Sequence, residues 1–166
     1  MLESELAARF AAGDASVFGE VFDRYSGAVY GFAHRMLGNR TDAEDVCAET
    51  FVRAFQRASE LRSAEALGTW LFAIARRLCA DRGRQAKLIS RSEFDGGGFA
   101  EGSDARVAVQ EALQDLSQSH REAIVLCDLE DLTHREAAAL LGLSVTCLKS
   151  RLYRGRRALR ERLGEG

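Results

Sequence analysis

The sequence predicts an all-α fold, and three observations support this. The 166 residues include no proline. The chain has few of the alternating β-branched stretches that are typical of strands. Apolar residues instead recur every three or four positions along most of the chain, as one face of a helix requires. With 46% hydrophobic and 29% charged residues, the composition is that of a globular protein, long enough for one ordinary domain or two small ones.

The first expected helices form one compact domain, residues 1–85. After an acidic, amphipathic N-terminus, MLESELAARF, a long apolar stripe runs between Gly13-Asp14 and Gly38-Asn39. This stripe comprises Phe18, Val21, Phe22, Tyr25, Val29, Phe32, Ala33 and Met36. Thr41 or Asp42 can cap the next helix, whose inward residues are Val46, Thr50, Phe51, Ala54 and Phe55. A further helix, from Leu67 to Leu78, continues into the basic segment RRLCADRGRQAK.

A gap in the apolar pattern separates this domain from a second one. The gap, SRSEFDGGGFAEGSD, lies in residues 86–105, which are predicted to form a flexible, acidic, glycine-rich linker. The second helical domain is expected at residues 106–166. It contains apolar groups at 107–116 and 123–127, and two final helices, Thr133–Leu141 and Ser144 to about Leu163.

Charge is distributed unevenly along the chain. The net charge is only −2, yet residues 76–91 carry six basic groups and one acid, and residues 145–163 carry seven basic groups and one acid. Residues 111–136 carry seven acids and two basic groups. Two separate basic clusters are expected if each one meets a polyanion.

Several classes of function are not supported by the residues. No apolar run could span a bilayer, and the N-terminus lacks the positive start of a secretory signal, so we expect a cytoplasmic protein without membrane insertion. The four cysteines are far apart, with no CxxC pair, and are interpreted as reduced, small apolar residues. His34, His120 and His134 lack a paired nucleophile or second ligand. We therefore expect no enzyme activity, cofactor, metal or small-molecule substrate.

The segment THREAAALLGLSVTCLKSRLYRGRRAL has the layout of a helix-turn-helix. Thr133 and Glu136 have capping-box spacing, Ala138 is small where the helices approach, and Gly142 suits the turn. Ser144 can cap the second helix. Three interpretations compete for the basic second helix: a solvated face, a membrane-surface helix, or a DNA-contacting helix. The narrow apolar stripe, which lacks Trp and Phe and is needed for the domain core, favours DNA.

The residues of this second helix divide into three groups. An apolar stripe, expected to pack on its own domain, comprises Val145, Leu148, Leu152, Leu159 and Leu163. Because the N-terminal part of such a helix enters the major groove, the candidates for contacts with base edges are Thr146, Lys149, Ser150 and Tyr153. The candidates for phosphate contacts are Arg154, Arg156, Arg157 and Arg160.

Two segments of the first domain, AEDVCAETFVRAF and GTWLFAIARRLCADRGR, together with this helix-turn-helix, resemble the extracytoplasmic-function (ECF) group of bacterial sigma factors. The three motifs occur in the family's order and cover most of the chain. The resemblance implies a helical region 2, a linker and a helical region 4. It also implies three partners. They are promoter DNA, both duplex and single-stranded; core RNA polymerase, through its β′ clamp and β flap; and an anti-sigma factor.

The resemblance also assigns roles to residues. Asp45 and Glu49, with Phe51 as packing, match the region 2.2 residues that dock on the clamp; Ala48 stands where the family usually has Gln. The expected minus-10 pocket and its cationic rim comprise Leu61, Arg62, Trp70, Arg76, Arg77 and Arg82. Trp70 is also expected in the core. In region 4, Lys149, Ser150, Tyr153 and Arg154 align with minus-35 contacts, whereas Ser117 replaces a proline and Cys147 replaces a common Thr.

The resemblance therefore predicts a sigma factor that recognises the minus-35 element and melts the minus-10 element. The alternative is a helix-turn-helix regulator without sigma activity, for instance one linked to a receiver domain. Such a protein would need βαβ units and an acidic pocket in its first domain, which the sequence does not contain. A helical adaptor that binds only protein or membrane is a second alternative.

Overall fold

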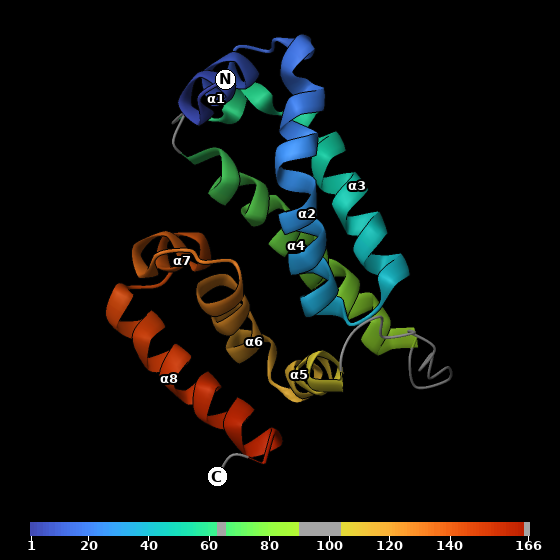
Figure 1. Cartoon of the computed structure of the whole chain (residues 1–166), viewed down its shortest axis with the longest axis vertical. Helices are drawn as coiled ribbons and strands as arrows, with labels where there is room; N and C mark the ends of the chain where they lie inside the picture. Colours follow the sequence, from blue (N-terminus) through green and yellow to red (C-terminus); the bar gives the residue numbers. More distant parts are fainter. Residues whose placement is uncertain (63–65, 90–103, 165–166) are drawn as a thin grey trace.

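The computed structural model describes residues 1–62, 66–89 and 104–164. These residues contain helices and no strand, which confirms the predicted all-α class. We refer to residues 1–89 as the N-terminal half and to residues 104–164 as the C-terminal half. The glycine-rich centre of the predicted linker lies outside the described residues. In Figure 1 the two halves lie side by side, with the chain termini at opposite ends of the molecule.

The N-terminal half is a four-helix unit. It consists of α1 (Glu3–Ala11), α2 (Phe18–Leu37), α3 (Arg40–Gln56) and α4 (Leu67–Ile89), with short 3₁₀ turns at Ala15–Val17 and Ala58–Glu60. Helices α2 and α3 run alongside one another, and α4 packs against both (Figure 1). The ring of Phe10 on α1 contacts the rings of Phe18, Phe55 and Trp70, and these contacts tie α1 to the bundle.

The corner between α2 and α3 is made by two residues. Gly38 ends α2 in the left-handed conformation, with φ at 77°, which glycine adopts without strain. Asn39 then caps α3, because its side chain accepts a hydrogen bond from the backbone N–H of Asp42. The prediction that Thr41 or Asp42 caps α3 is therefore wrong, since the cap lies two or three residues earlier, at Asn39, and the helix begins at Arg40.

The predicted apolar stripe of α2 is largely buried, with one exception. Phe22 is 42% exposed and lies edge-on against the ring of Phe51 on α3, so it covers the core from outside rather than filling it. Thr50 is fully buried as predicted, and its hydroxyl donates a hydrogen bond to the carbonyl of Val46 at 2.7 Å. The bond satisfies the only polar group of that side chain.

The C-terminal half contains α5 (Asp104–Asp115), α6 (Gln118–Ile124), a π-helical turn (Val125–Leu129), α7 (His134–Leu141) and α8 (Val145–Arg162). Helix α8 packs along α6, and Gly155 permits the close approach. A Cβ atom at this position would lie 3.2 Å from Cδ1 of Ile124 and 3.3 Å from the backbone oxygen of His120. The buried apolar residues of both halves form one continuous cluster.

Candidate nucleic-acid interfaces

The predicted helix-turn-helix is present and is closed by side-chain caps. Thr133 and Glu136 form the expected capping box at the start of α7. Gly142 ends α7 with φ at 68°, and the Ser144 hydroxyl accepts a hydrogen bond from the backbone N–H of Cys147 at 3.1 Å. Leu148 is fully buried, and α8 packs against α7 as well as α6. The short turn and the two caps therefore fix the orientation of α8.

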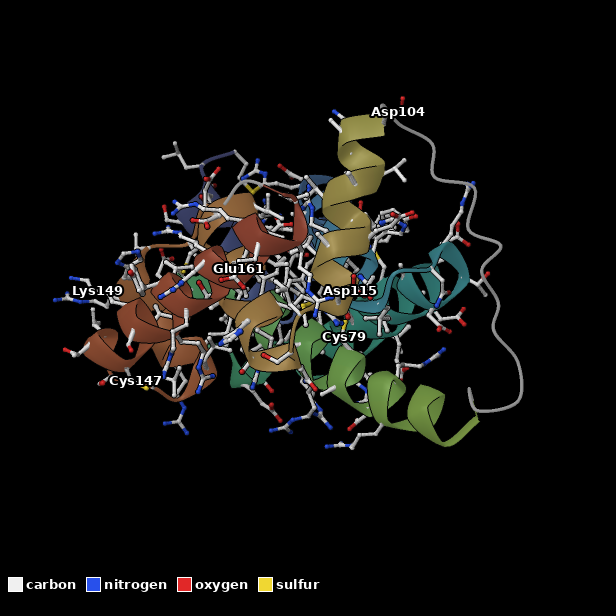
Figure 2. The ribbon with its side chains drawn as sticks, turned by 90° about the horizontal axis from the view of Figure 1, so that it is seen from below. Cys79, Asp104, Asp115, Cys147, Lys149 and Glu161 are labelled. Carbon is white, nitrogen blue, oxygen red and sulfur yellow. The ribbon has the colours of Figure 1, made fainter. Side chains whose placement is uncertain are left out.

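One face of α8 presents every residue predicted to contact the minus-35 element. All of them are exposed: Thr146, Lys149, Ser150, Tyr153, Arg154, Arg156, Arg157 and Arg160. At about 100° per residue they occupy roughly half of the helix circumference. Leu148 and Leu152 are buried on the opposite side. Figure 2 shows Lys149 projecting from the end of α8, away from the rest of the protein.

Two predictions about α8 need correction or refinement. Val145 was expected to pack on the domain but is 37% exposed, because it precedes the turn in which Leu148 becomes buried. Cys147 is also exposed, so it does not pack as a core residue (Figure 2).

Cys47 and Cys79, in contrast, are buried and free, as predicted, and burial raises the pKa of Cys79 to about 12.

Arg156 differs from the other cations of this face, because it is held by a carboxylate. Its guanidinium donates two hydrogen bonds to Asp128, at 3.0 and 2.6 Å. Hydrogen bonding to Asp128 raises the pKa of Arg156. Arg157 approaches Glu161 only to 3.8 Å, and both side chains are about 70% exposed. Arg157 is therefore the more available of the two for a phosphate.

The six predicted minus-10 residues differ in their exposure. Leu61 is 7% exposed and belongs to the core, while Arg62 and Arg77 are exposed. Trp70 is half-buried against Phe10 and so has the core role that was predicted for it. The predicted base-holding loop includes residues 63–65, which lie outside the described residues.

Two of the predicted rim arginines are engaged in ion pairs. Arg82 contacts Asp42 at 3.2 Å and Asp45 at 3.3 Å. Arg76 donates to both oxygens of Glu122, at 3.1 and 3.4 Å. Glu122 belongs to α6 in the C-terminal half and its side chain is 4% exposed. No local pattern in the sequence indicates this pairing, because the partners are 46 positions apart.

The predicted polymerase-binding acids lie on α3. Asp45 is exposed, and Glu49 is half-buried beside Arg53, at 2.9 Å. Phe51 is 2% exposed and therefore supports α3 from the core side. A small hollow of about 150 Å³ adjoins these acids; it is lined by Glu49, Arg53, Leu78, Asp81, Arg82 and Gln85. The acidic face is thus bordered by cations of α3 and α4.

Residues that the sequence did not single out join the two halves. Gln110 and Gln114 on α5, and Arg121 on α6, donate hydrogen bonds to backbone carbonyls at the end of α2. Arg35 pairs with Glu130 at 2.6 Å. Burial raises the pKa of Glu130, and the charge of Arg35 opposes that effect. A sequence pattern identifies helix faces but not the distant residues that they meet.

The described residues also bear on metal binding and membrane insertion. No three His, Cys, Asp or Glu side chains within residues 1–62, 66–89 and 104–164 are grouped as a metal ion would require. None of the helices within those ranges is long and apolar enough to cross a membrane.

Comparison with known proteins gives two family matches and a set of relatives. The model for sigma-70 region 2 matches residues 21–89, and the model for sigma-70 region 4 matches residues 106–159. The chain is 31% identical over 171 residues to the ECF RNA polymerase sigma factor SigW of Bacillus subtilis, covering 91% of each protein.

Solved structures resemble the chain over nearly its whole length. The sigma factor RpoE of Bartonella quintana, in complex with the anti-sigma factor NepR, superposes with a TM-score of 0.74 at 28% identity, over 89% of this chain and 96% of that one. CnrH, in complex with the cytosolic domain of CnrY, has a TM-score of 0.74 at 30% identity, over 98% and 97%. The helix-turn-helix, the two family matches and these relatives together show that the chain belongs to the ECF group of RNA polymerase sigma factors.

Proposed function

We propose that this sigma factor recognises the minus-35 duplex through the exposed face of α8. The single observation that carries the proposal is that all eight predicted residues of α8 share one solvent-exposed face, opposite the buried Leu148 and Leu152. Thr146, Lys149 and Ser150, near the N-terminal end of the helix, would reach base edges. The more distal arginines would contact phosphates, and Arg157 would contribute more than the paired Arg156.

Region 2, for which we propose residues 1–85, would hold the minus-10 strand. Trapping an unstacked base requires an apolar or stacking wall and a cationic rim for the backbone. Arg62 and Arg77 are exposed and available for the rim. Trp70 is half-buried, so part of its ring is available to a base while the rest packs on Phe10.

The exposed Asp45 and the neighbouring Glu49 support a proposed docking surface for the β′ clamp of core RNA polymerase. They lie four residues apart on α3, so both carboxylates share one face and suit a basic coiled coil. Region 4, for which we propose residues 106–166, would also meet the β flap. Residues 86–105 would connect the two regions.

We also propose that an anti-sigma factor controls this protein. RpoE was solved with the anti-sigma factor NepR, and CnrH with the cytosolic domain of CnrY. The likeness to CnrH extends over 98% of this chain, so both halves contribute to it. Because RNA polymerase performs the chemistry, the protein would act in the bacterial cytoplasm as an initiation factor, without catalytic activity of its own.

Run-off transcription with purified core RNA polymerase tests the proposal. A library of promoter fragments is transcribed by core polymerase alone and by core plus this protein, with no inhibitory partner present. We expect transcripts with defined start sites only when the protein is added. Binding to duplex DNA without any initiation would instead support a helix-turn-helix regulator.

A further inference from the structure

The first turn of α8 carries apolar atoms that are exposed to solvent. Three consecutive residues, Val145, Thr146 and Cys147, are all exposed, and we refer to them as the α8 tip. Val145 is 37% exposed, although valine is among the residues most often buried. The tip presents an isopropyl group, a methyl group and a thiol. The exposed residues that follow in α8, from Lys149 on, are mostly cationic.

Local hydrogen bonds hold the tip in place. The Ser144 hydroxyl accepts a hydrogen bond from the backbone N–H of Cys147 at 3.1 Å, and the Ser144 carbonyl accepts one from that of Leu148 at 2.9 Å. The Leu148 side chain is fully buried. Val145 and Thr146 are β-branched, so each has few rotamers in a helix. The tip would therefore lose little conformational entropy on binding a partner.

The α8 tip lies at the end of the helix that is expected to enter the major groove. Figure 2 shows Cys147 and Lys149 at this end of α8, away from Glu161. On every base pair the major groove presents hydrogen-bonding groups, and its one apolar group is the C5-methyl of thymine. Contact between this methyl and the apolar atoms of the tip would remove both surfaces from water, which is favourable. Thymine is therefore the base that complements the tip.

Phosphate groups are a poorer partner for these three residues. The protein groups that contact phosphates are cations, hydroxyls and backbone N–H groups. The Val145 side chain has none of these, and the backbone N–H of Cys147 already donates to Ser144. Arg154 and Arg157, further along the exposed face of α8, supply the cations that phosphates require. The tip is thus better suited to bases than to the DNA backbone.

Lys149 indicates the base that lies next to these thymines. A lysine or arginine in the major groove most often donates to O6 and N7 of guanine. Lys149 follows the centre of the tip by three residues, which is about 4.5 Å along the helix axis. One base pair spans about 3.4 Å of the duplex. The guanine and the thymines should therefore lie within one or two base pairs of each other.

We propose that the α8 tip recognises thymine methyl groups of the minus-35 element, beside a guanine that Lys149 contacts. This inference rests on the proposed function, because it takes α8 as the helix that contacts the minus-35 duplex. It adds Val145 and Cys147 to the residues that determine promoter specificity. It also gives the recognised bases a chemical identity.

Selection from a random library identifies the bases. Core RNA polymerase loaded with the full-length protein, here called the holoenzyme, is incubated with random duplexes of promoter length, and bound fragments are sequenced. We expect two enriched motifs, the upstream one containing thymine within one or two base pairs of guanine. No enrichment beyond that of core polymerase alone would overturn the proposed function, and this inference with it. An upstream motif that lacks either base would overturn this inference alone.

Replacement of thymine by uracil tests the methyl contacts directly. Uracil lacks only the C5-methyl group and pairs with adenine in the same way. We expect the affinity of the holoenzyme to fall about threefold for each buried methyl group that is removed from the upstream motif. The same number of replacements outside both motifs is the control and should leave the affinity unchanged. Equal affinities for the thymine and uracil forms of the upstream motif would refute the proposal.

Each tip residue has a substitution that reduces its apolar surface: Val145→Ala, Thr146→Ser and Cys147→Ser. We expect each variant holoenzyme to distinguish thymine from uracil less than the wild type does, so that the ratio of the two affinities moves towards one. Val52→Ala is the matched control, because it removes the same carbons from an exposed valine of α3. It should retain the wild-type ratio, which does not depend on how much holoenzyme forms. All four positions are exposed, so each variant should remain folded.

Two results would contradict the role of the tip. If Val145→Ala weakened binding to the thymine and uracil duplexes by the same factor, the valine would pack on sugar or backbone atoms instead. If all three tip variants kept the wild-type ratio, thymine recognition would belong to other residues of α8. Either result would overturn the assignment of the tip, while the selected upstream motif would still support the proposed minus-35 function.

Discussion

Arg121 provides the sharpest test of how region 4 is held together. Its guanidinium donates to four backbone carbonyls, those of Leu113 at 2.7 Å, Gln114 at 2.9 Å, Leu116 at 3.0 Å and Met36 at 2.6 Å. Three of these carbonyls belong to the end of α5 and the turn into α6. One side chain therefore caps α5, orients α6 and contacts region 2.

Arg121→Met removes every donor while retaining a long, flexible side chain. A hydrogen bond to a charged group contributes about 1.5–3 kcal/mol, and bonds that share one group are not additive. Arg121 is only half-buried, so water replaces part of what is lost. We expect the free energy of unfolding of region 4 to fall by about 3 kcal/mol. With an m-value of about 2 kcal/mol/M, the urea midpoint should fall by about 1.5 M.

Two probes separate region 4 from region 2 in the full-length protein. Far-ultraviolet circular dichroism follows the helices of both regions. The fluorescence of Trp70, the only tryptophan in the chain, follows region 2 alone, where it packs on Phe10. Three of the four lost bonds are internal to region 4. The urea transition in circular dichroism should therefore shift to lower urea by much more than the transition in Trp70 fluorescence.

Arg135→Met is the matched control, because Arg135 is an exposed residue of α7. It should leave the free energy of unfolding within about 0.5 kcal/mol of the wild-type value, as substitutions at exposed positions usually do. If Arg121→Met were as stable as this control, the four carbonyls would be adequately hydrated without the guanidinium, and the assigned role of Arg121 would be wrong.

Three other features yield predictions. Gly155→Val should lower the free energy of unfolding by about 1–3 kcal/mol in a thermal melt, because the added carbons must enter the close contact between α8 and α6. Lys149→Ala should change minus-35 base preference in binding assays on promoter libraries, whereas Arg157→Ala should weaken binding to all sequences and reduce the slope of log affinity against log salt by about 1. Glu136→Gln should destabilise region 4 at neutral pH but not in acid. The backbone and hydroxyl hydrogen bonds of Thr133 lower the pKa of Glu136, so its contribution is present above the unfolded-state pKa and is lost as pH falls through the folded pKa.

Each of these predictions has an outcome that contradicts it. A Gly155→Val protein with the wild-type melting temperature would mean that α8 moves away from α6 at little cost. Uniform weakening by Lys149→Ala would argue against base readout, and an unchanged salt slope would remove Arg157 from the phosphate contacts. A constant difference in stability between wild type and Glu136→Gln from pH 7 to pH 3 would show that the ionised carboxylate is not the stabilising form.

Local signals in the sequence predicted most of the helices and several of their ends. The capping box at Thr133, the turn at Gly142 and the cap at Ser144 were all predicted and are all present. These features depend on residues within one turn of each other, which a sequence displays directly. Asn39 was missed as the cap of α3 because Thr41 and Asp42 are equally good capping residues nearby.

Contacts between residues far apart in the chain could not be predicted in this way. The pairing of Arg76 with Glu122 requires the packing of α6 against the N-terminal half, and Arg156 reaches Asp128 only once α8 lies along α6. A run of arginines indicates a cationic surface in sequence. In the folded structure, some of these arginines form ion pairs with carboxylates and others face solvent.

Where the end of α2 meets region 4, α2 contributes main-chain carbonyls and region 4 contributes side-chain donors. Any residue at positions 34 and 36 presents the same carbonyl, so these hydrogen bonds tolerate drift there. Gln110, Gln114 and Arg121 supply side-chain donors, and their replacement removes the bonds. Among descendants of this protein that keep these hydrogen bonds, we expect amino-acid substitutions to accumulate unequally. The end of α2 should vary more freely than its three partners in region 4.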